Sequence, residues 1–470
     1  MPKQFRVVSP VDGSIVVRRT EATPAQIARA LDDAKRAQRE WRATPLTDRI
    51  AAVGAAMQHM AGMRDAIAET LTLCMGRPAR WAGLEVDGMV GRAEHMMGIA
   101  PDCLADIHPA PIEGFTRFMR REPLGVVLVL SPWNYPYLTA VNAIVPALIA
   151  GNAVILKHSD QTPLAAEHFA DAFAAADLPA GVFQALHMNH EATRQVLGDD
   201  CIDHVCFTGS VAGGIQVNRA IASRAGRNRF IAAVLELGGN DPAYVRPDAD
   251  VAFAAENIVE GVLFNSGQSC CGIERIYVHE DVASEFIEAA VAAAKAWTLG
   301  DPRDDATTLG PVVRQRNADG IRTQMARALE SGARPLLDAT AWAKERADST
   351  YVAPQLLTNV DHSMALMADE TFGPCAGIMS VRNDDDAVRL MNDSTFGLTA
   401  SIWSADEVKV TNLAEQVEAG TVFMNRCDYL DPALAWTGVK HSGRGVTLSS
   451  LGFEHLTRAK SFHFRTRMPS

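Results

Sequence analysis

Short, uniformly apolar runs alternate with longer amphipathic segments along the first half of the chain. The runs 126–130, 153–156, 182–186 and 204–207 are too brief for exposed helices, and alanine-rich segments with helical spacing, such as 163–176, separate them. Strands that are apolar on both faces and alternate with helices are typical of a parallel sheet covered on both sides. This pattern predicts a doubly wound α/β domain of the dinucleotide-binding kind.

A helix start is predicted ahead of the first apolar run. Thr23 can act as the N-cap, Pro24 fits the first turn, and Gln26 can complete a capping box. Apolar residues then follow at helical spacing: Ile27, Leu31, Ala34 and Trp41.

A second α/β set begins after Gly238 and Gly239. Its pattern predicts a helix at 251–264, a strand at 276–278 and a helix at 282–297. A chain of 470 residues is also too long for one core, so two or three domains are expected.

Charge and cysteine content narrow the class of protein. A formal net charge of −12 argues against nucleic acid as a partner, because such binders gather lysine and arginine. The eight cysteines are scattered without a Cys-x-x-Cys pair, which favours a reducing compartment and predicts no metal site. No secretory signal follows the first residues, and prolines interrupt the apolar stretch 124–156. We therefore expect a cytoplasmic protein without a membrane partner.

A thiol and a carboxylate, each in a glycine-containing segment, are candidates for catalytic residues. Cys270 ends the sequence Gly-Gln-Ser-Cys, and Glu236 follows an apolar run and precedes Gly238 and Gly239. A free cysteine is often only a small buried hydrophobe, and a glutamate in a turn can simply accept backbone hydrogen bonds. Together they supply a nucleophile and a candidate general base whose pKa a nearby apolar cleft would raise.

Four motifs in register resemble the NAD(P)-dependent aldehyde dehydrogenase superfamily. They are the two segments around Cys270 and Glu236, Pro-Trp-Asn-Tyr-Pro at 132–136, and Glu-Thr-Phe-Gly-Pro at 370–374. The similarity runs from about residue 10 to about residue 465. It implies a Rossmann-type cofactor domain of residues 1–103 and 124–237 and an α/β catalytic domain of residues 238–450. A small β oligomerisation element, including a hairpin near 104–123, would combine residues 104–123 with 451–470.

The resemblance also assigns catalytic roles. Cys270 would attack the aldehyde to form a thiohemiacetal, because the family places its nucleophile two residues after the glutamine, which passes over Cys271. Asn134 would complete an oxyanion hole with the Cys270 backbone N–H. Glu236 would activate the water that releases the product, and its presence favours hydrolysis to the acid over transfer to coenzyme A.

The cofactor residues implied by the resemblance are spread over several strand ends. They are Trp133, Lys157, Asp160, Gly209, Ser210, Glu370 and Phe372. Gly209 and Ser210 belong to the expected pyrophosphate turn, while Glu370 and Phe372 would hold the nicotinamide half. Asp160 would accept the adenosine ribose hydroxyls and repel a 2′-phosphate, so NAD is expected, with NADP as the alternative.

The aldehyde pocket implied by the resemblance is mixed in character. Its residues are Tyr135, Leu138, Thr139, Ser269, Cys271, Tyr429, Leu430 and Trp436. These favour an apolar aliphatic or aromatic aldehyde. A carboxylate-bearing semialdehyde is the alternative, with Arg426 as a candidate anchor unless Asp428 pairs with it. Where the family often has an acidic residue of a proton relay, this chain has Val446 and Thr447.

Functions of other classes use some of the same residues. A catalytically silent scaffold would keep the fold for stability alone, and a thiol esterase would use Cys270 and Glu236 without a cofactor. The formation of NADH distinguishes both from an aldehyde dehydrogenase.

Two segments alternate apolar and polar residues as edge strands do. Residues 115–123 and 460–465 show this alternation, and an unpaired edge strand invites pairing with another chain. Each segment could instead close on its own domain. The resemblance implies that the terminal strand joins a neighbouring subunit, so we expect a homodimer or a homotetramer.

Overall fold

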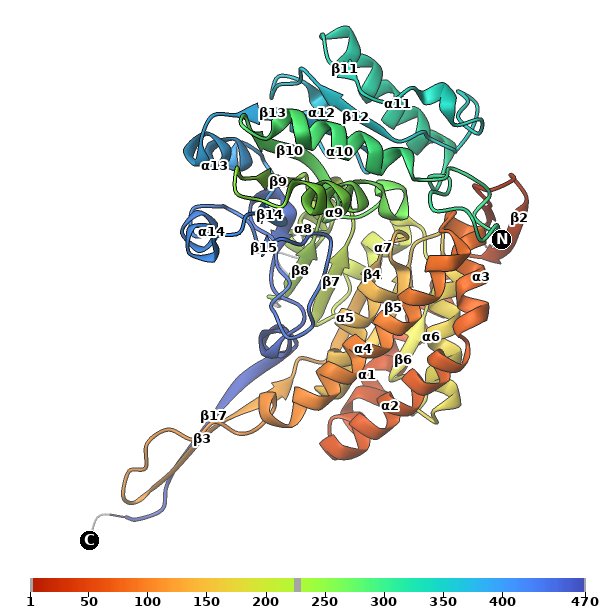
Figure 1. Cartoon of the computed structure of the whole chain (residues 1–470). Helices are drawn as coiled ribbons and strands as arrows, with labels where there is room; N and C mark the ends of the chain where they lie inside the picture. Colours follow the sequence, from red (N-terminus) through yellow and green to blue (C-terminus); the bar gives the residue numbers. More distant parts are fainter. Residues whose placement is uncertain (1–2, 224–229, 469–470) are drawn as a thin grey trace.

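The computed structural model describes residues 3–223 and 230–468. Figure 1 shows two α/β lobes and a two-stranded ribbon that projects away from them. Two short strands, β1 (Gln4–Val8) and β2 (Ile15–Thr20), form a separate antiparallel hairpin. Within the described residues, no helix is long and apolar enough to cross a membrane.

The first lobe is built on a six-stranded sheet with the order β16-β8-β7-β4-β5-β6. Its strands are β4 (Val126–Ser131), β5 (Ala153–His158), β6 (Phe183–Ala185), β7 (His204–Thr208), β8 (Ala232–Glu236) and β16 (Gly443–Arg444). All neighbours are parallel except β16, which runs antiparallel to β8. The structure therefore confirms the four predicted strands and their parallel arrangement.

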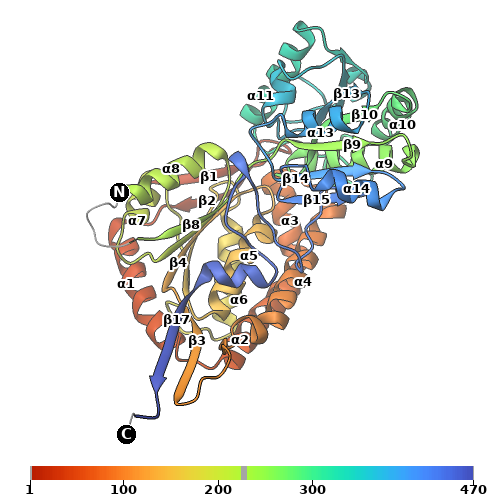
Figure 2. The same ribbon diagram turned by 90° about the vertical axis from the view of Figure 1, so that its left-hand side faces the viewer.

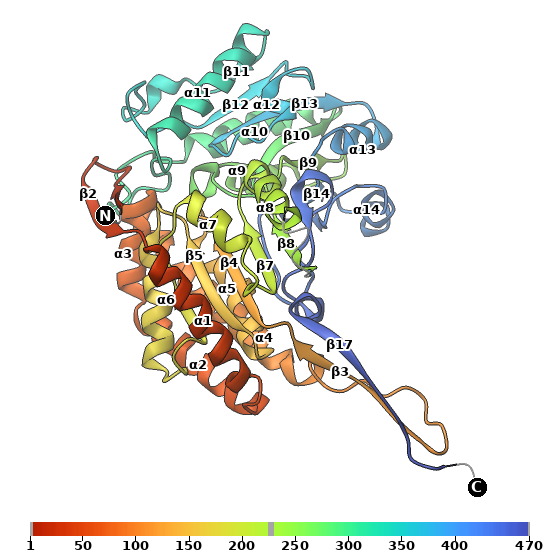
Figure 3. The same ribbon diagram turned by 180° about the vertical axis from the view of Figure 1, so that it is seen from behind.

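Among the described residues, eight helices belong to this lobe. They are α1 (Pro24–Trp41), α2 (Leu46–Gly62), α3 (Arg64–Met75), α4 (Ala79–Cys103), α5 (Pro136–Ile149), α6 (Pro163–Ala175), α7 (His190–Leu197) and α8 (Val211–Ala222). Thr23 caps α1 and forms the predicted capping box with Gln26. Figure 3 shows α1, α7 and α8 on the face of the sheet opposite to α4 and α5.

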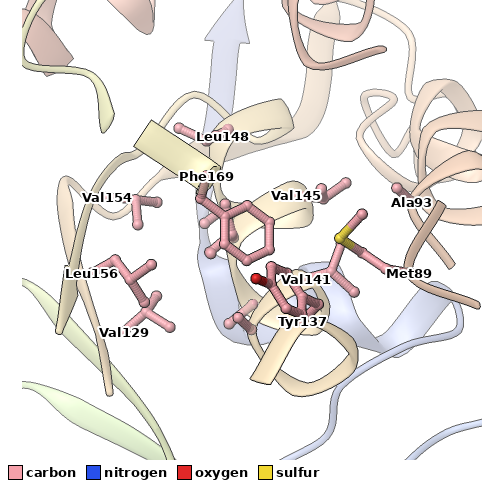
Figure 4. Packing of buried hydrophobic residues seen from close by; sticks show 14 of the residues in the cluster. Met89, Ala93, Val129, Tyr137, Val141, Val145, Leu148, Val154, Leu156 and Phe169 are labelled. Atoms are coloured by element: carbon pink, nitrogen blue, oxygen red, sulfur yellow. The ribbon is translucent and has the colours of Figure 1, made fainter. Parts of the chain in front are cut away.

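Alternation along each strand explains why both faces of this sheet are buried. In β4, Val126, Leu128 and Leu130 pack in the core under α1, α7 and α8, while Val127 and Val129 pack in the core under α2, α4, α5 and α6. Figure 4 shows this second core, with the α5 side chains between strand residues and Met89 of α4. A rigid sheet covered on both sides fixes the positions of its strand ends.

The second lobe contains a seven-stranded sheet with the order β11-β12-β13-β10-β9-β14-β15. Its strands are β9 (Asp241–Val245), β10 (Ile273–His279), β11 (Arg334–Pro335), β12 (Gln355–Thr358), β13 (Cys375–Val381), β14 (Thr399–Trp403) and β15 (Thr421–Met424). Its helices are α9 (Val251–Leu263), α10 (Ala283–Lys295), α11 (Gln315–Glu330), α12 (Ala365–Ala368), α13 (Asp384–Asn392) and α14 (Glu407–Ala414). The predicted helices at 251–264 and 282–297 are present as α9 and α10, and the strand predicted at 276–278 is the longer β10.

The chain crosses between the lobes more than once. Figure 2 shows the C-terminal segment returning from the second lobe to the first. There β16 pairs with β8, and Trp436, Leu448 and Phe453 enter the core beneath the first sheet. We propose that the division between the domains lies between β8 and β9, with residues 436–456 packed on the cofactor side rather than within the expected catalytic domain 238–450.

The projecting ribbon consists of β3 (Phe115–Pro123) and β17 (Thr457–Arg465). They pair antiparallel along their whole length, and Phe118 stacks on Phe462 with ring centroids 4.4 Å apart. The two predicted edge segments therefore pair with each other. The hairpin predicted near 104–123 is reduced to one isolated antiparallel bridge between Ile107 and Met119 of β3. Two prolines at 109 and 111 explain this, since proline has no N–H to donate to a ladder.

Candidate active site

Cys270 lies in a tight loop between α9 and β10, facing the carboxyl ends of β4, β7 and β8. Asn265 and Ser266 have φ values of 53° and 59°, and Gly267 has a φ of 69°. A Cβ on Gly267 would lie 2.1 Å from the Gly373 carbonyl oxygen, so only glycine fits there. Steric constraints thus explain the glycine in the Gly-Gln-Ser-Cys sequence. It allows the loop to fold back and to present the thiol at the cleft.

Two cavities meet at this thiol. One has a volume of about 430 Å³ and the other about 240 Å³, and Thr208, Glu236 and Cys270 line both. The candidate nucleophile and the candidate base therefore border both spaces.

The larger cavity is the candidate aldehyde pocket. All eight pocket residues predicted from the sequence line it: Tyr135, Leu138, Thr139, Ser269, Cys271, Tyr429, Leu430 and Trp436. Sequence reasoning missed Phe264, Asn142 and three residues of α4, namely Gly88, Gly91 and Arg92. These residues carry no motif, and only the packing of α4 beside α5 brings them to the pocket.

Cys271 and Asp428 form a buried pair of groups next to the nucleophile. The Asp428 carboxylate accepts hydrogen bonds from the Ser269 hydroxyl at 2.7 Å and from the Cys271 thiol at 3.0 Å. The adjacent Cys270 thiol and burial raise the pKa of Cys271 well above its usual value. Its position against Asp428 and its burial therefore disfavour the Cys271 thiolate.

Arg426 does not enter the pocket. Its guanidinium lies over the Tyr429 ring, 3.3 Å from the centroid, and it does not line the larger cavity. Asp428 takes its hydrogen bonds from Ser269 and Cys271. The structure thus supports neither Arg426 as a carboxylate anchor nor its pairing with Asp428, because the arginine stacks on an exposed ring instead.

Glu236 ends β8 in a largely buried position. Its carboxylate accepts hydrogen bonds from the Thr208 hydroxyl at 2.8 Å and from the Thr447 hydroxyl. Burial raises the pKa of Glu236, while the Thr447 and Thr208 hydroxyls and the charge of Arg92 oppose that rise. Thr447, which stands in place of an acidic relay residue, contacts the candidate base directly.

Asn134 follows β4, and hydrogen bonds fix both its side-chain amide and its main-chain carbonyl. Its side-chain amide donates to the Gln268 carbonyl at 3.3 Å, directly beside the Cys270 loop. Its own carbonyl accepts from Arg77 Nη2 at 2.7 Å and from Asn265 Nδ2 at 3.2 Å. The amide is thus fixed close to the nucleophile, as an oxyanion donor requires.

The smaller cavity holds five of the seven predicted cofactor residues, together with Asn134. They are Trp133, Gly209, Ser210, Glu370 and Phe372. Trp133 and Phe372 pack edge to face with centroids 5.6 Å apart. Phe372 has a φ of 54°, and the buried Glu274 holds this loop by accepting its N–H at 2.8 Å.

Glu370 presents a carboxylate suited to accept hydroxyl groups. It accepts the Gly239 N–H at 3.0 Å, and burial raises its pKa to about 7. Asn317 lines the same cavity, and within the described residues its buried Oδ1 has no hydrogen-bond partner. Sequence reasoning missed Asn317, because it lies on α11, far from every recognised motif.

A third cavity, of about 540 Å³, continues from the second through Thr208 and Ser210. Ser210 caps α8 and accepts the Gly213 N–H at 3.2 Å, so the first turn of α8 opens on this space. The end of a helix with free N–H groups suits a phosphate. Lys157 also lines this cavity, as predicted.

Asp160 lies apart from these cofactor cavities. Its side chain is 68% exposed, pairs with Arg314 Nη2 at 2.8 Å, and borders a surface hollow that Lys157 does not line. Arg314 and Lys157 lower the pKa of Asp160, although burial opposes them. In this arrangement Asp160 pairs with Arg314 and does not line the described cofactor cavities, so its contact with a ribose stays a prediction.

Comparison with known proteins gives a consistent result over nearly the whole chain. Residues 1–462 match the model of the aldehyde dehydrogenase family. Succinate-semialdehyde dehydrogenase [NADP(+)] 1 of Mycobacterium tuberculosis is 32% identical over 463 residues, covering 97% of this chain and 98% of that protein. An aldehyde dehydrogenase of Paenarthrobacter nicotinovorans is 34% identical over 457 residues, with 97% and 98% covered.

Solved structures agree with this similarity. The succinic semialdehyde dehydrogenase of Streptococcus pyogenes, in complex with NADP+, has a TM-score of 0.92 at 27% identity and covers 98% of this chain and 100% of its own. A betaine aldehyde dehydrogenase of Staphylococcus aureus, in complex with NAD+, gives the same TM-score and identity, with 100% and 94% covered. The chain therefore belongs to the aldehyde dehydrogenase family and is an NAD(P)-dependent oxidoreductase that acts on aldehydes.

Proposed function

We propose that the protein oxidises an aldehyde to its carboxylic acid, with Cys270 as the nucleophile. The observation that carries this proposal is the position of Cys270 on the shared boundary of two cavities. A thiohemiacetal must pass its hydride to a nicotinamide, so the nucleophile has to border both the aldehyde and the cofactor.

The chemistry then follows from the groups around the thiol. The Cys270 sulfur attacks the carbonyl carbon, and the Asn134 amide donates to the oxygen that gains charge. A bound NAD(P) would supply the hydride acceptor, and loss of hydride from the thiohemiacetal would leave a thioester on Cys270. Glu236 takes a proton from water as that water attacks the thioester, which releases the acid and restores the thiol.

The cofactor cavities fit a dinucleotide. We propose that Trp133, Glu370 and Phe372 hold the nicotinamide half, that Gly209 and Ser210 contact the pyrophosphate, and that Lys157 binds the adenosine half. The expected preference for NAD rested on Asp160, whose charge Arg314 neutralises here. Because the mycobacterial relative is named for NADP, we propose that this chain accepts NADP as well as NAD.

We propose a carboxylate-bearing semialdehyde as the preferred substrate class, in place of the apolar aldehyde expected from the pocket residues. The support is the similarity to two succinate-semialdehyde dehydrogenases. The apolar walls of the larger cavity, such as Leu138, Leu430 and Trp436, suit the carbon chain of such a substrate. We also propose a cytoplasmic homo-oligomer.

The test compares Cys270→Ser with the wild type in an assay of NAD(P)H formation at 340 nm. Cys270→Ser should lose at least about a thousandfold in kcat with every aldehyde, because the hydroxyl is a far weaker nucleophile than the thiolate. Cys103→Ser, at the end of α4 and outside the cavities, is the matched control. No NAD(P)H across an aldehyde panel, with hydrolysis of an activated ester retained, would instead support the cofactor-free esterase.

A further inference from the structure

One arginine enters the larger cavity from α4. Gly88, Gly91 and Arg92 lie at adjacent positions on one face of this helix, and all three line the cavity. A Cβ on Gly91 would meet nothing within 4 Å, and one on Gly88 would touch only the Leu138 side chain, at 3.0 Å. The two glycines leave open space in front of the helix, and Arg92 is the side chain of α4 that reaches into it.

The guanidinium of Arg92 has few partners. Its Nη1 donates to the Leu138 carbonyl at 2.8 Å and to Asn142 Oδ1 at 3.3 Å. Within residues 3–223 and 230–468, no acceptor lies within hydrogen-bond distance of Nε or Nη2, and no carboxylate lies within 4.0 Å of the group. A guanidinium offers five N–H donors in a fixed fork, so most of its capacity remains available in the cavity.

The surrounding charges show why this position can select a ligand. Glu236 and Asp428 are the carboxyl groups that line the same cavity, together with the thiols of Cys270 and Cys271. Burial raises the pKa of both carboxyl groups, and it lowers the pKa of Arg92. Threonine, serine and thiol groups donate to the two carboxyl groups. Among the described residues neither carboxyl lies within ion-pair distance of Arg92, although the charge of Glu236 acts on it from further away. A half-buried cation without a direct ion-pair partner is stabilised by an anion that enters with the substrate.

We propose that Arg92 binds the distal carboxylate of a short ω-oxo acid while Cys270 engages its aldehyde. This inference rests on the proposed function, which supplies the aldehyde end. A planar carboxylate matches the fork of a guanidinium, and the free Nε and Nη2 are the pair that such bidentate contact uses. The cavity of about 430 Å³ has room for a chain of a few carbons between the two groups.

Arg92 is thereby a specificity-determining residue. A neutral aldehyde of the same length leaves the guanidinium unpaired in the cavity and forgoes its interaction energy. An aldehyde with a quaternary ammonium group would be repelled by Arg92 and could bind only through Asp428 and the aromatic rings of Tyr135 and Tyr429.

The experiment measures kcat/KM for 4-oxobutanoate, butanal, 5-oxopentanoate and pentanal with the wild type, Arg92→Met and Arg92→Lys. The wild type should prefer each oxo acid to its neutral counterpart by at least about thirtyfold. Arg92→Met should lose most of this preference, mainly through a higher KM for the oxo acids, because loss of the charge near Glu236 acts equally on butanal and pentanal and cancels in the ratio. Arg92→Lys should retain part of the preference, since it keeps the charge and loses the fork.

The matched control is Arg80→Met, which makes the same change at an exposed position of α4. It should leave all four values unchanged. Inhibition by succinate gives a second readout, because its inhibition constant should rise in Arg92→Met in step with the KM for 4-oxobutanoate.

Three outcomes would overturn the inference. Equal losses on charged and neutral aldehydes would show that Arg92 only braces α5 through Leu138 and Asn142. A wild type that prefers neutral aldehydes would show that Arg92 does not select for a carboxylate, and so would one that prefers a trimethylammonium aldehyde. Both results come from the wild type alone and do not depend on the folding of the variants. If no aldehyde gives NAD(P)H, the proposed function itself fails, which is a different result from loss of selectivity.

Discussion

Arg77 donates a hydrogen bond of 2.7 Å from Nη2 to the main-chain carbonyl of Asn134. The same guanidinium pairs with Glu85, and the side chains of this pair are 2% and 0% exposed. Glu85 in turn accepts the Tyr137 N–H at 2.8 Å, at the start of α5. One buried ion pair thus ties α4 to the peptide that carries the candidate oxyanion donor.

Breaking this pair should lower both stability and turnover. Arg77→Met leaves the Glu85 carboxylate buried without its partner, so we expect the free energy of unfolding to fall by about 3–5 kcal/mol. We also expect kcat to fall more than tenfold, because the Asn134 peptide loses its restraint. Denaturant unfolding and steady-state kinetics measure the two effects. Arg64→Met, which breaks the solvent-exposed Arg64–Asp87 pair, should change little, and a stable, active Arg77→Met would argue against this role.

The Thr447 hydroxyl donates a hydrogen bond to Glu236. Removing this hydroxyl should shift the pH dependence of the deacylation step. Burial raises the pKa of Glu236 and the Thr447 hydroxyl lowers it, so Thr447→Val should raise that pKa further. A base works only when deprotonated, so the acidic limb of the kcat profile should move to higher pH.

The measurement is kcat from pH 5.5 to 9.5, with single-turnover decay of the acyl-enzyme to isolate the deacylation step. Activity at the acidic end should fall more than activity at the alkaline end. Thr447→Ser keeps the donor and should follow the wild-type profile; if Thr447→Val does so as well, Thr447 does not act on the base.

Much of the fold could be predicted because its strands are buried on both faces. Uniform apolar runs such as 126–130 follow directly from cores on either side of the sheet, and the capping box at Thr23 is a local signal. The two-residue strand β16 gave no such signal. It exists only because β8 offers a free edge to a segment more than two hundred positions later in the chain.

The candidate site divides in the same way. Cys270, Glu236 and Asn134 lie in motifs with a steric or chemical reason, and the structure brings them together. Arg92 and Asn317 stand on helices without a motif, so only tertiary packing reveals them. The orientation of Asp160 depends on Arg314, which is remote in sequence, so the sequence alone could not show this ion pair.

Cofactor choice should depend on the Asp160–Arg314 pair. Asp160→Ser removes a negative charge and frees the Arg314 guanidinium, which Gln161 still holds near Lys157 through a 2.7 Å hydrogen bond. The ratio of kcat/KM for NADP to that for NAD should rise by about fivefold or more. Adding Arg314→Met to this variant should remove most of the gain. An unchanged ratio in Asp160→Ser would show that this pair does not face the ribose.

Cofactor affinity should rise with pH through the titration of Glu370. Burial raises the pKa of this carboxyl to about 7, and only its deprotonated form accepts two ribose hydroxyls. The dissociation constant of NAD, measured by calorimetry, should therefore fall between pH 6 and pH 8 and level off above. Glu370→Gln should bind more weakly and show a flat profile, whereas Glu256→Gln on the surface of α9 should behave as the wild type. A wild-type dissociation constant that is independent of pH would count against Glu370 as a ribose ligand.

The ribbon of β3 and β17 should determine the oligomeric state. β17 pairs with β3 on one side, no described strand covers its other edge, and the Phe464 side chain is 52% exposed. An uncovered edge on a projecting ribbon favours pairing with a second copy of the chain, so the full-length protein should be a homodimer or a homotetramer by light scattering.

Truncation after Leu456 removes β17 and leaves β3 without its partner, so it should give monomers or insoluble protein. Phe464→Lys is the milder variant, because a lysine on an edge strand opposes pairing without removing the ribbon. It should weaken association while the monomer keeps its fold by circular dichroism. If the truncated chain still sediments as a dimer, the contact between subunits lies elsewhere on the molecule. The free edge of β17 would then face solvent and pair with no other subunit.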